Sequence, residues 1–143
     1  MPHVERSLEI EAPVKKVFNT IDDTMLATRW NLVVKELKEI EAGKYAVKTT
    51  LGDLVSTRAE TVPNKKISLS VEGGAFRNYG YILKKKGDST EVTLWAEFED
   101  ESQEKMLLKA GMLLLQSLKN YVEFIESGGN PEEFDKKKMI ATH

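Results

Sequence analysis

Tyrosine and arginine side chains are the groups in this chain whose chemistry could serve a bound molecule. The 143 residues include no cysteine, and the two histidines, His3 and His143, stand near the ends, where chain segments are commonly poorly ordered. This distribution argues against a thiol nucleophile, a catalytic triad and a histidine-ligated zinc site. We therefore expect no metal ion and no cofactor, and a function that depends on shape and hydrogen bonding.

Three tyrosines and two arginines are candidates for contacts with the oxygen atoms of a ligand. A tyrosine hydroxyl can hydrogen-bond to a carbonyl or a phenol, and a guanidinium offers a fixed fork of donors to a carboxylate or an enolate. Each residue type also has a structural explanation, because tyrosines are common on half-buried strands and arginines form salt bridges at protein surfaces. The candidates are Tyr45, Tyr79, Tyr81, Arg6 and Arg77.

Two other short patterns have structural explanations. Asp22 and Asp23 stand where a short helix is expected to begin, so capping accounts for them better than metal binding or general-base catalysis. Gly73-Gly74 lacks the lysine, the serine or threonine and the following helix that a phosphate-binding loop needs. Neither pattern predicts a catalytic site.

The composition predicts a single cytoplasmic domain. Lysine and arginine number 21 against 23 aspartate and glutamate, a formal net charge of −2, so no basic surface for nucleic acid is expected. The longest apolar run, residues 110–115, is far shorter than the roughly 20 residues that a membrane-spanning helix needs. The first residues also lack the charged start and apolar run of a secretory signal. We therefore expect a cytoplasmic protein with no transmembrane segment and no nucleic-acid partner.

The spacing of apolar residues and turn signals predicts the elements that position these side chains. Residues 4–10 alternate like a strand with one buried face, Pro13 suits the first turn of a helix, and a second short helix is expected before Asn31. Residues 102–127 carry an apolar stripe at helical spacing that ends at Gly128-Gly129. Turn signals about every 8–12 residues predict an antiparallel meander of strands at 33–41, 44–51, 54–62, 66–72, 76–85 and 90–99.

This order of elements resembles the helix-grip fold of the START-like superfamily, the polyketide cyclase, dehydrase and lipid-transport proteins (SRPBCC). The similar motifs are Ala12-Pro13 at the first helix, Trp30 before the second strand, and the hairpin Gly87-Asp88-Ser89-Thr90. The resemblance implies an α+β fold in which a curved seven-stranded antiparallel sheet wraps around the long C-terminal helix, with two short helices between strands 1 and 2. Residues 1–129 would form this domain, and residues 130–143 a polar C-terminal tail that is partly disordered.

Such a fold implies a cavity between sheet and helix, and strand parity predicts which side chains face it. Parity places Val55, Thr57 and Ala59 inward and Arg58 outward, although a single β-bulge would reverse such an assignment. Gly111 lies on the apolar stripe of the long helix, where glycine costs roughly 1 kcal/mol relative to alanine, so close packing or open space is expected there. The predicted cavity residues are Arg6, Leu8, Trp30, Tyr45, Val47, Thr49, Thr57, Leu69, Arg77, Tyr79, Tyr81, Leu94, Leu107, Gly111 and Leu114.

Three functions remain open at this point. The first is binding or transport of a small hydrophobic ligand such as a lipid, quinone, polyketide or isoprenoid, without catalysis. The second is a polyketide cyclase or aromatase activity, which would need Arg6, Arg77 or a tyrosine to present its polar head in the cavity without a protein partner. The third is a role in protein–protein interaction, as a cochaperone or assembly domain or through a homodimer, by a surface that contains the outward-facing Trp95, Leu54 and Val62.

Overall fold

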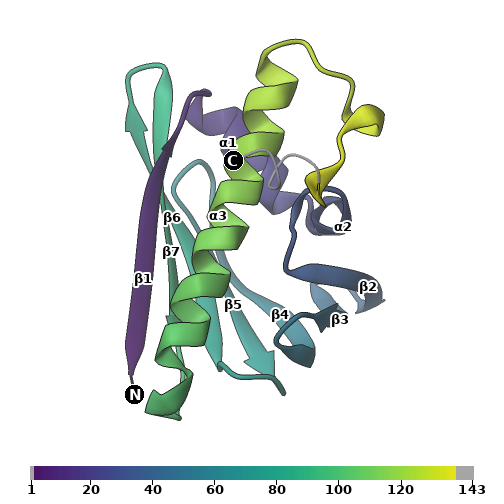
Figure 1. The fold of residues 1–143 in the computed structure, drawn as a ribbon, viewed down its shortest axis with the longest axis vertical. Helices are drawn as coiled ribbons and strands as arrows, with labels where there is room; N and C mark the ends of the chain where they lie inside the picture. The colour runs from purple at the N-terminus through teal and green to yellow at the C-terminus, as the bar shows by residue number, and fades with distance from the viewer. Residues whose placement is uncertain (1, 138–143) are drawn as a thin grey trace.

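The computed structural model describes residues 2–137 and confirms the predicted α+β architecture (Figure 1). A first strand is followed by two short helices, a six-stranded meander and one long helix. The elements are β1 (His3–Ile10), α1 (Val14–Asp22), α2 (Ala27–Trp30), β2 (Val34–Glu41), β3 (Lys44–Thr49), β4 (Gly52–Val62), β5 (Lys66–Glu72), β6 (Asn78–Lys86), β7 (Ser89–Glu97) and α3 (Glu104–Glu126). Short 3-10 turns occupy Thr24–Leu26, Glu101–Gln103 and Pro131–Glu133.

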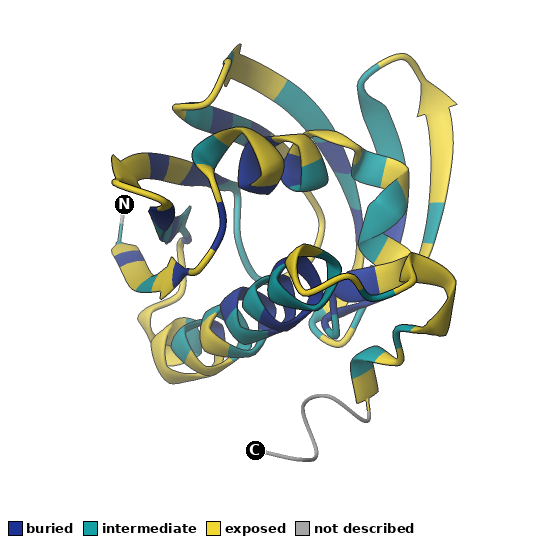
Figure 2. Cartoon of the chain, turned by 90° about the horizontal axis from the view of Figure 1, so that it is seen from above, coloured by how far each residue is buried: buried dark blue, intermediate teal, exposed yellow. Residues whose placement is uncertain are grey.

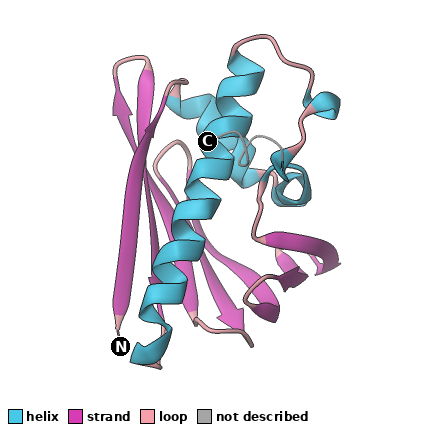
Figure 3. Ribbon diagram, in the orientation of Figure 1, coloured by secondary structure: helices cyan, strands magenta, loops and turns pink. Residues whose placement is uncertain are grey.

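The sheet is one antiparallel surface of seven strands in the order β1-β7-β6-β5-β4-β3-β2. The first strand therefore pairs with the last, and α3 crosses the concave face of the sheet (Figure 3). Pairing of β1 with β7 and of β6 with β7 runs without interruption. In contrast, the β2–β3 and β4–β5 pairs each contain register shifts, which bend a strand and strengthen its twist.

The main hydrophobic core lies between α3, α1 and the strands β1, β5, β6 and β7. Seen from above, the sheet curves round one side of α3, and buried parts of both face the interior (Figure 2). The apolar stripe of α3 predicted from its helical spacing supplies Leu118, which is completely buried, and the structure adds Leu115, which is also completely buried. Pro13 precedes the first residue of α1, whose Val17 and Phe18 cover the same core.

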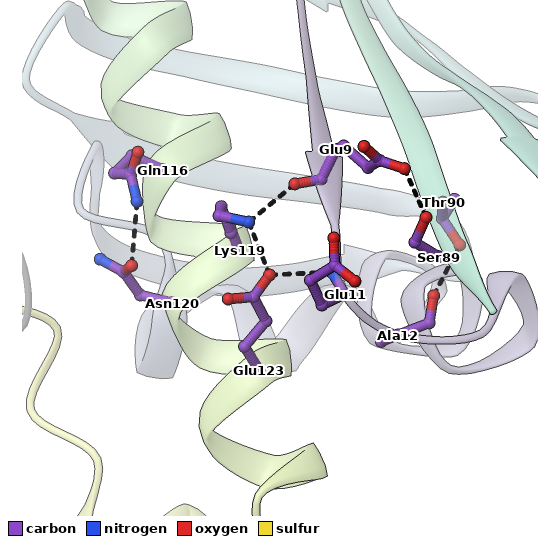
Figure 4. A network of polar contacts seen from close by, with 9 residues as sticks. All are labelled: Glu9, Glu11, Ala12, Ser89, Thr90, Gln116, Lys119, Asn120 and Glu123. Atoms are coloured by element: carbon purple, nitrogen blue, oxygen red, sulfur yellow. Dashed lines mark hydrogen bonds and ion pairs between the residues drawn. The ribbon is translucent and has the colours of Figure 1, made fainter. Parts of the chain in front are cut away.

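A polar network ties the end of β1 to the C-terminal half of α3 (Figure 4). Lys119 Nζ donates to the Glu9 carbonyl at 2.8 Å and to Glu123 Oε2 at 2.6 Å. Glu123 Oε2 also accepts from the Glu11 backbone N–H at 2.8 Å. Charge-assisted hydrogen bonds of this kind are stronger than neutral ones, so the helix is held firmly at this edge of the sheet.

The start of the predicted polar tail is attached to the domain. The Phe134 ring packs edge-on against Tyr121, with centroids 5.0 Å apart, and also contacts Phe124. Lys136 Nζ donates to the carbonyls of Thr28, Asn31 and Val34 at 2.8, 2.9 and 2.9 Å. The segment up to residue 137 therefore fastens α3 to the junction of α2 and β2, and the rest of the predicted tail, residues 138–143, lies outside the described residues.

Within residues 2–137, no helix combines the length and the apolar character needed to cross a bilayer.

Candidate ligand cavity

An apolar chamber of about 90 Å³ lies between the N-terminal half of α3 and strands β3, β4 and β7. Leu107, Gly111 and Leu114 form its helical wall, and Val47 and Leu54 face them from the sheet. A Cβ added at Gly111 would meet only Leu94 Cδ2, at the ordinary contact distance of 3.5 Å. Gly111 therefore avoids no clash, and its missing side chain leaves space. We call this space the outer chamber.

A second space of about 60 Å³ adjoins the outer chamber and is more polar. The two share Asn31, Val34, Val47 and Tyr79 in their walls. The deeper space, which we call the inner chamber, is also lined by Trp30, Tyr45, Ser56, Arg58, Leu69 and Tyr81. An apolar space thus leads to a smaller one that contains indole, hydroxyl and guanidinium groups.

Two polar atoms in the wall of the inner chamber are buried without a hydrogen-bond partner among the described residues: Trp30 Nε1 and Ser56 Oγ. Trp30 is 2% exposed and Ser56 is 3% exposed, so neither side chain is compensated by bulk water. A buried donor without a hydrogen bond costs about 1–3 kcal/mol. Such atoms therefore mark places where the protein itself does not supply the hydrogen-bond partner.

Tyr79 and Tyr81 present neutral phenols in the same chamber. Burial raises the pKa of Tyr79, and the nearby Ser56 hydroxyl and Arg58 charge offset part of that rise. Burial raises the pKa of Tyr81 well above its ordinary value, with a further rise from Tyr79 and a partial offset from Arg58. Ser56 Oγ lies near Tyr79 but does not reach hydrogen-bonding geometry. Because the pKa of each phenol is raised above its ordinary value, both phenols are protonated at neutral pH.

Arg58 occupies one wall of the inner chamber with its guanidinium already engaged. Its Nη1 donates to Asp22 Oδ1 at 2.7 Å and to Thr61 Oγ1 at 3.0 Å. Its Nη2 donates to the Asp22 carbonyl and to Thr24 Oγ1, each at 3.1 Å. Asp22 was expected to cap a helix, and instead it holds Arg58 and offsets its charge.

Comparison with known proteins identifies the architecture. No protein-family model and no curated protein sequence matches the chain. Among solved structures, a START superfamily protein from Mycobacterium smegmatis aligns with a TM-score of 0.74 at 16% identity, covering 86% of this chain and 98% of that one. The chain has a START-like helix-grip fold. The sheet of this helix-grip fold encloses α3, and the two chambers lie where the enclosure is incomplete.

Two further solved structures share the helix-grip fold. The Zhui aromatase/cyclase from Streptomyces sp. R1128 aligns with a TM-score of 0.74 at 14% identity, covering 90% of this chain and 99% of that one. The Aha1 dimer from Colwellia psychrerythraea aligns with a TM-score of 0.69 at 16% identity, covering 86% and 97%. Identities this low establish a common fold and nothing about activity.

Most of the residues predicted for the cavity lie in the wall of one or both chambers of the helix-grip domain. The sheet residues point inward because their strands keep the predicted parity, and the α3 residues lie on the predicted stripe. Leu8 is half-buried and packs against the main core without lining either chamber. The residues in the walls are Trp30, Tyr45, Val47, Thr49, Leu69, Tyr79, Tyr81, Leu94, Leu107, Gly111 and Leu114.

The predicted positions of Arg6 and Arg77 in the cavity are wrong. Arg6 has the inward parity of β1 but lies on an edge strand, where its long side chain reaches solvent and is exposed. Arg77 precedes β6 at the rim of the sheet, and its Nε donates to Glu99 Oε1 at 2.9 Å outside both chambers. Neither arginine lines the outer or the inner chamber.

The inward orientation predicted for Thr57 is also wrong, and Val55 and Ala59 share the error. Counting back from the β4–β5 turn, Thr61 lies opposite Ile67, but the register shifts between Arg58 and Glu60. One extra residue at this bulge places Arg58 opposite Leu69 and turns it into the cavity. Sequence analysis therefore missed Leu54, Ser56 and Arg58, and the only available signal was the general sensitivity of parity to a bulge.

Trp95 borders the outer chamber, but its ring lies on the other face of β7 from Leu94, as parity predicts. Its ring covers Gly80, where an added Cβ would be 2.8 Å from Trp95 Cζ2, and it stacks on His3 with centroids 6.1 Å apart. The ring is therefore half-covered by its own chain. A homodimer contact through Trp95 stays a prediction.

Within residues 2–137, no three histidine, cysteine, aspartate or glutamate side chains gather in a way that could hold a metal ion.

Proposed function

We propose that this protein binds, and by binding carries, a small apolar molecule in the two-chamber cavity. The outer chamber is the observation that carries this proposal. Protein interiors are normally packed as densely as organic crystals, yet here an apolar space separates the sheet from its helix. Concave apolar walls with a few polar groups at one end are the usual form of a small-molecule site.

The size of the chambers limits the ligand that the present conformation accepts. The outer and inner chambers measure about 90 and 60 Å³. Drug-sized ligands usually occupy pockets of about 300–1,000 Å³. A compound of about one ring therefore suits the cavity as it stands, and a long lipid requires β2 and β3 to move away from α3. Small size also makes the site easy to block by a single side chain.

The test is to ask whether filling the outer chamber abolishes binding. Native mass spectrometry of the purified protein, before and after denaturation, detects a co-purified molecule, and titration with a library of single-ring apolar compounds detects saturable binding. We expect Gly111→Leu to lose both, because its side chain projects into the outer chamber. Met112→Leu is the matched control, since Met112 is an exposed neighbour on the same helix. Circular dichroism verifies that both variants fold.

Absence of a co-purified molecule together with absence of saturable binding across the library would contradict the proposal. Equal binding by the wild type and Gly111→Leu would also contradict it, because the ligand would then bind outside the chamber. Loss of binding by Met112→Leu as well would point to the surface of α3 instead.

A cyclase or aromatase activity is a second candidate, supported by the phenols in the inner chamber. Tyr79 and Tyr81 lie in its wall beside Arg58, and polarisation of a substrate carbonyl needs such donors in a site without bulk water. The fold is shared with an aromatase/cyclase. We expect Tyr79→Phe with Tyr81→Phe to abolish turnover of a polycarbonyl substrate and to leave the binding of a carbonyl-free ligand unchanged. Turnover that survives both substitutions would remove this candidate.

A further inference from the structure

Each polar side chain in the wall of the inner chamber can donate a hydrogen bond, and the indole and the guanidinium cannot accept one. An indole N–H and a guanidinium can only donate, and the hydroxyls of Tyr79 and Tyr81 can donate to any acceptor placed between them. No aspartate, glutamate or histidine is among the described residues that line this chamber. A molecule that enters the chamber therefore meets donors on several sides, and the side-chain acceptors it meets are neutral hydroxyl and amide oxygens.

The wall provides no acceptor for the Trp30 indole. Asn31 is the neighbouring residue with a side-chain carbonyl, and its Oδ1 already accepts from the Val33 backbone N–H at 2.9 Å. The Asn31 backbone carbonyl accepts from Lys136 Nζ. Trp30 Nε1 is left without a partner within residues 2–137, although its ring lines the chamber. A ligand acceptor at this position would remove the free-energy penalty of a buried donor that has no hydrogen bond.

The donors of the chamber act with little net charge. Asp22 Oδ1 lies 2.7 Å from Arg58 Nη1, so the one formal charge in the wall is already paired. Tyr79 and Tyr81 are neutral, because burial raises the pKa of each phenol. A carboxylate placed here would lose its hydration and find no free cation, which is a costly arrangement. An ammonium group would find hydroxyl and amide oxygens as acceptors but no carboxylate among the described residues that line the chamber.

We infer that the inner chamber binds an uncharged carbonyl oxygen of the ligand, of the ketone, ester or quinone type, while the ligand's apolar body occupies the outer chamber. The inference rests on the proposed function and narrows its ligand class. A carbonyl oxygen has two lone pairs, so it can accept from the Trp30 indole and from one hydroxyl at the same time. The chamber of about 60 Å³ has room for one such group and not for a second ring.

Three ligands of nearly equal shape test the inference: acetophenone, ethylbenzene and benzoate. We expect acetophenone to bind about tenfold more tightly than ethylbenzene, which corresponds to about 1.4 kcal/mol, and benzoate to bind more weakly than either. Proton–nitrogen NMR gives a direct second readout, because the chain has two tryptophans. The Trp30 indole N–H resonance should move downfield with acetophenone, whereas the indole of Trp95, on the other face of β7, should not move.

Substitution then assigns the preference to the indole. Trp30→Phe should lower the affinity for acetophenone to that for ethylbenzene and leave ethylbenzene binding within about twofold, because the ring wall is kept and the donor is lost. Trp95→Phe is the matched control and should retain the full preference. If Trp30→Phe does not fold, the wild-type indole shift and the affinity ratio still decide the question.

The possible failures are distinguishable. Equal affinities for acetophenone and ethylbenzene, with an unmoved Trp30 indole, would overturn the carbonyl site and leave the proposed apolar binding intact. Tighter binding of benzoate would overturn the requirement for an uncharged group. Failure of all three compounds to bind would overturn the proposed function and the carbonyl site together.

Discussion

The two sides of the sheet meet the same helix in opposite ways. On the side formed by β1 and the part of β7 around Val92, which we call the closed side, α3 packs directly on the strands, and Val92, Leu115 and Leu118 are completely buried. Residues 94–96 of β7 border the outer chamber. On the side formed by β2, β3 and β4, the open side, α3 is separated from Val47 and Leu54 by the outer chamber. One helix and one sheet thus build a packed core and a cavity within the same fold.

Strand register explains the difference. The β1–β7 pair is continuous from His3 to Ile10, so the strand keeps Val4, Leu8 and Ile10 on the face toward the core. On the open side, the β2–β3 pair has shifts between Val34 and Glu36 and between Glu39 and Glu41, and β4 has another after Arg58. Bulges bend strands, and a helix that lies flat on the closed side cannot follow that bend. The cavity is therefore a consequence of irregular pairing on one side of the sheet.

The largest expected effect is a difference in stability loss between substitutions at two neighbouring leucines of α3. Leu115 is completely buried in the main core, whereas Leu114 also borders the outer chamber. We expect Leu115→Ala to lower the free energy of unfolding by about 3–5 kcal/mol and Leu114→Ala by about 2 kcal/mol, because Leu114 already lacks neighbours on one side. Denaturant unfolding measures both. Equal losses would mean that the outer chamber is filled in solution.

Two glycines provide the next contrast. Gly80 lies between β5 and β7, where an added Cβ would be 2.6 Å from the Ile67 carbonyl oxygen, whereas a Cβ at Gly111 has room. We expect Gly80→Ala to cost about 1–3 kcal/mol of unfolding free energy through overpacking, and Gly111→Ala to gain up to about 1 kcal/mol from helix propensity. Thermal unfolding of the two variants measures the signs. A destabilising Gly111→Ala would show that the helix approaches the sheet more closely than the structure places it.

Lys136 tests the comparison, because its hydrogen bonds are made on the open side only. Its ammonium holds three carbonyls at the α2–β2 junction, which borders both chambers. We expect Lys136→Met to lower the unfolding free energy by about 1–2 kcal/mol. Amide hydrogen exchange should accelerate at residues 31–34 and remain unchanged in β1 and β7. Lys137→Met is the control, because Lys137 is exposed, and uniform acceleration over the whole sheet would contradict a local role.

The smallest effect is a dependence on alkaline pH that arises from the inner chamber. The pKa of Tyr79 and that of Tyr81 are raised above 10.0 by burial. The stability contributed by these neutral phenols is therefore fully present below the unfolded-state pKa and is lost as the pH rises through the folded-state pKa. At pH about 10.5 we expect a loss of less than about 1 kcal/mol per tyrosine.

The double variant Tyr79→Phe with Tyr81→Phe should lose less stability than the wild type between pH 9 and pH 11, as measured by chemical unfolding. The same loss in both proteins would place the titrating groups elsewhere, and the phenols would then be more hydrated than the buried inner chamber allows.

Local patterns were sufficient to predict the elements and their order, and the resemblance to the helix-grip fold supplied their arrangement in space. The alternation in β1, Pro13 before α1 and the long apolar stripe of α3 each report a short-range physical requirement, and each element lies within a few residues of its predicted bounds. Residue pairs that contain glycine, and the pair Pro63-Asn64, predicted the turns. Asn64 and Gly73 adopt positive φ there, a conformation that few other residues tolerate. The meander order then followed from short connections between antiparallel strands.

Prediction of the cavity wall succeeded where pairing is regular and failed where it is not. Tyr79, Tyr81 and Leu94 lie on strands whose register runs without a shift, so counting by twos kept them on the inner face. Thr57 failed because one bulge in β4 exchanged the two faces. The prediction for Arg77 failed for another reason. Parity does not show where a strand ends, and side chains at the rim of the sheet turn toward solvent.

The sequence by itself determined the elements, their order and the apolar faces that must meet, because these depend on interactions between residues close together in the chain. Only the tertiary structure decided that Ser56 and Arg58 enter the cavity, that Trp30 Nε1 has no partner within residues 2–137, and that Lys136 fastens the open side. These features depend on contacts between residues far apart in the chain and on the exact place of a bulge. No local pattern encodes where the curvature of a sheet exceeds what a straight helix can fill.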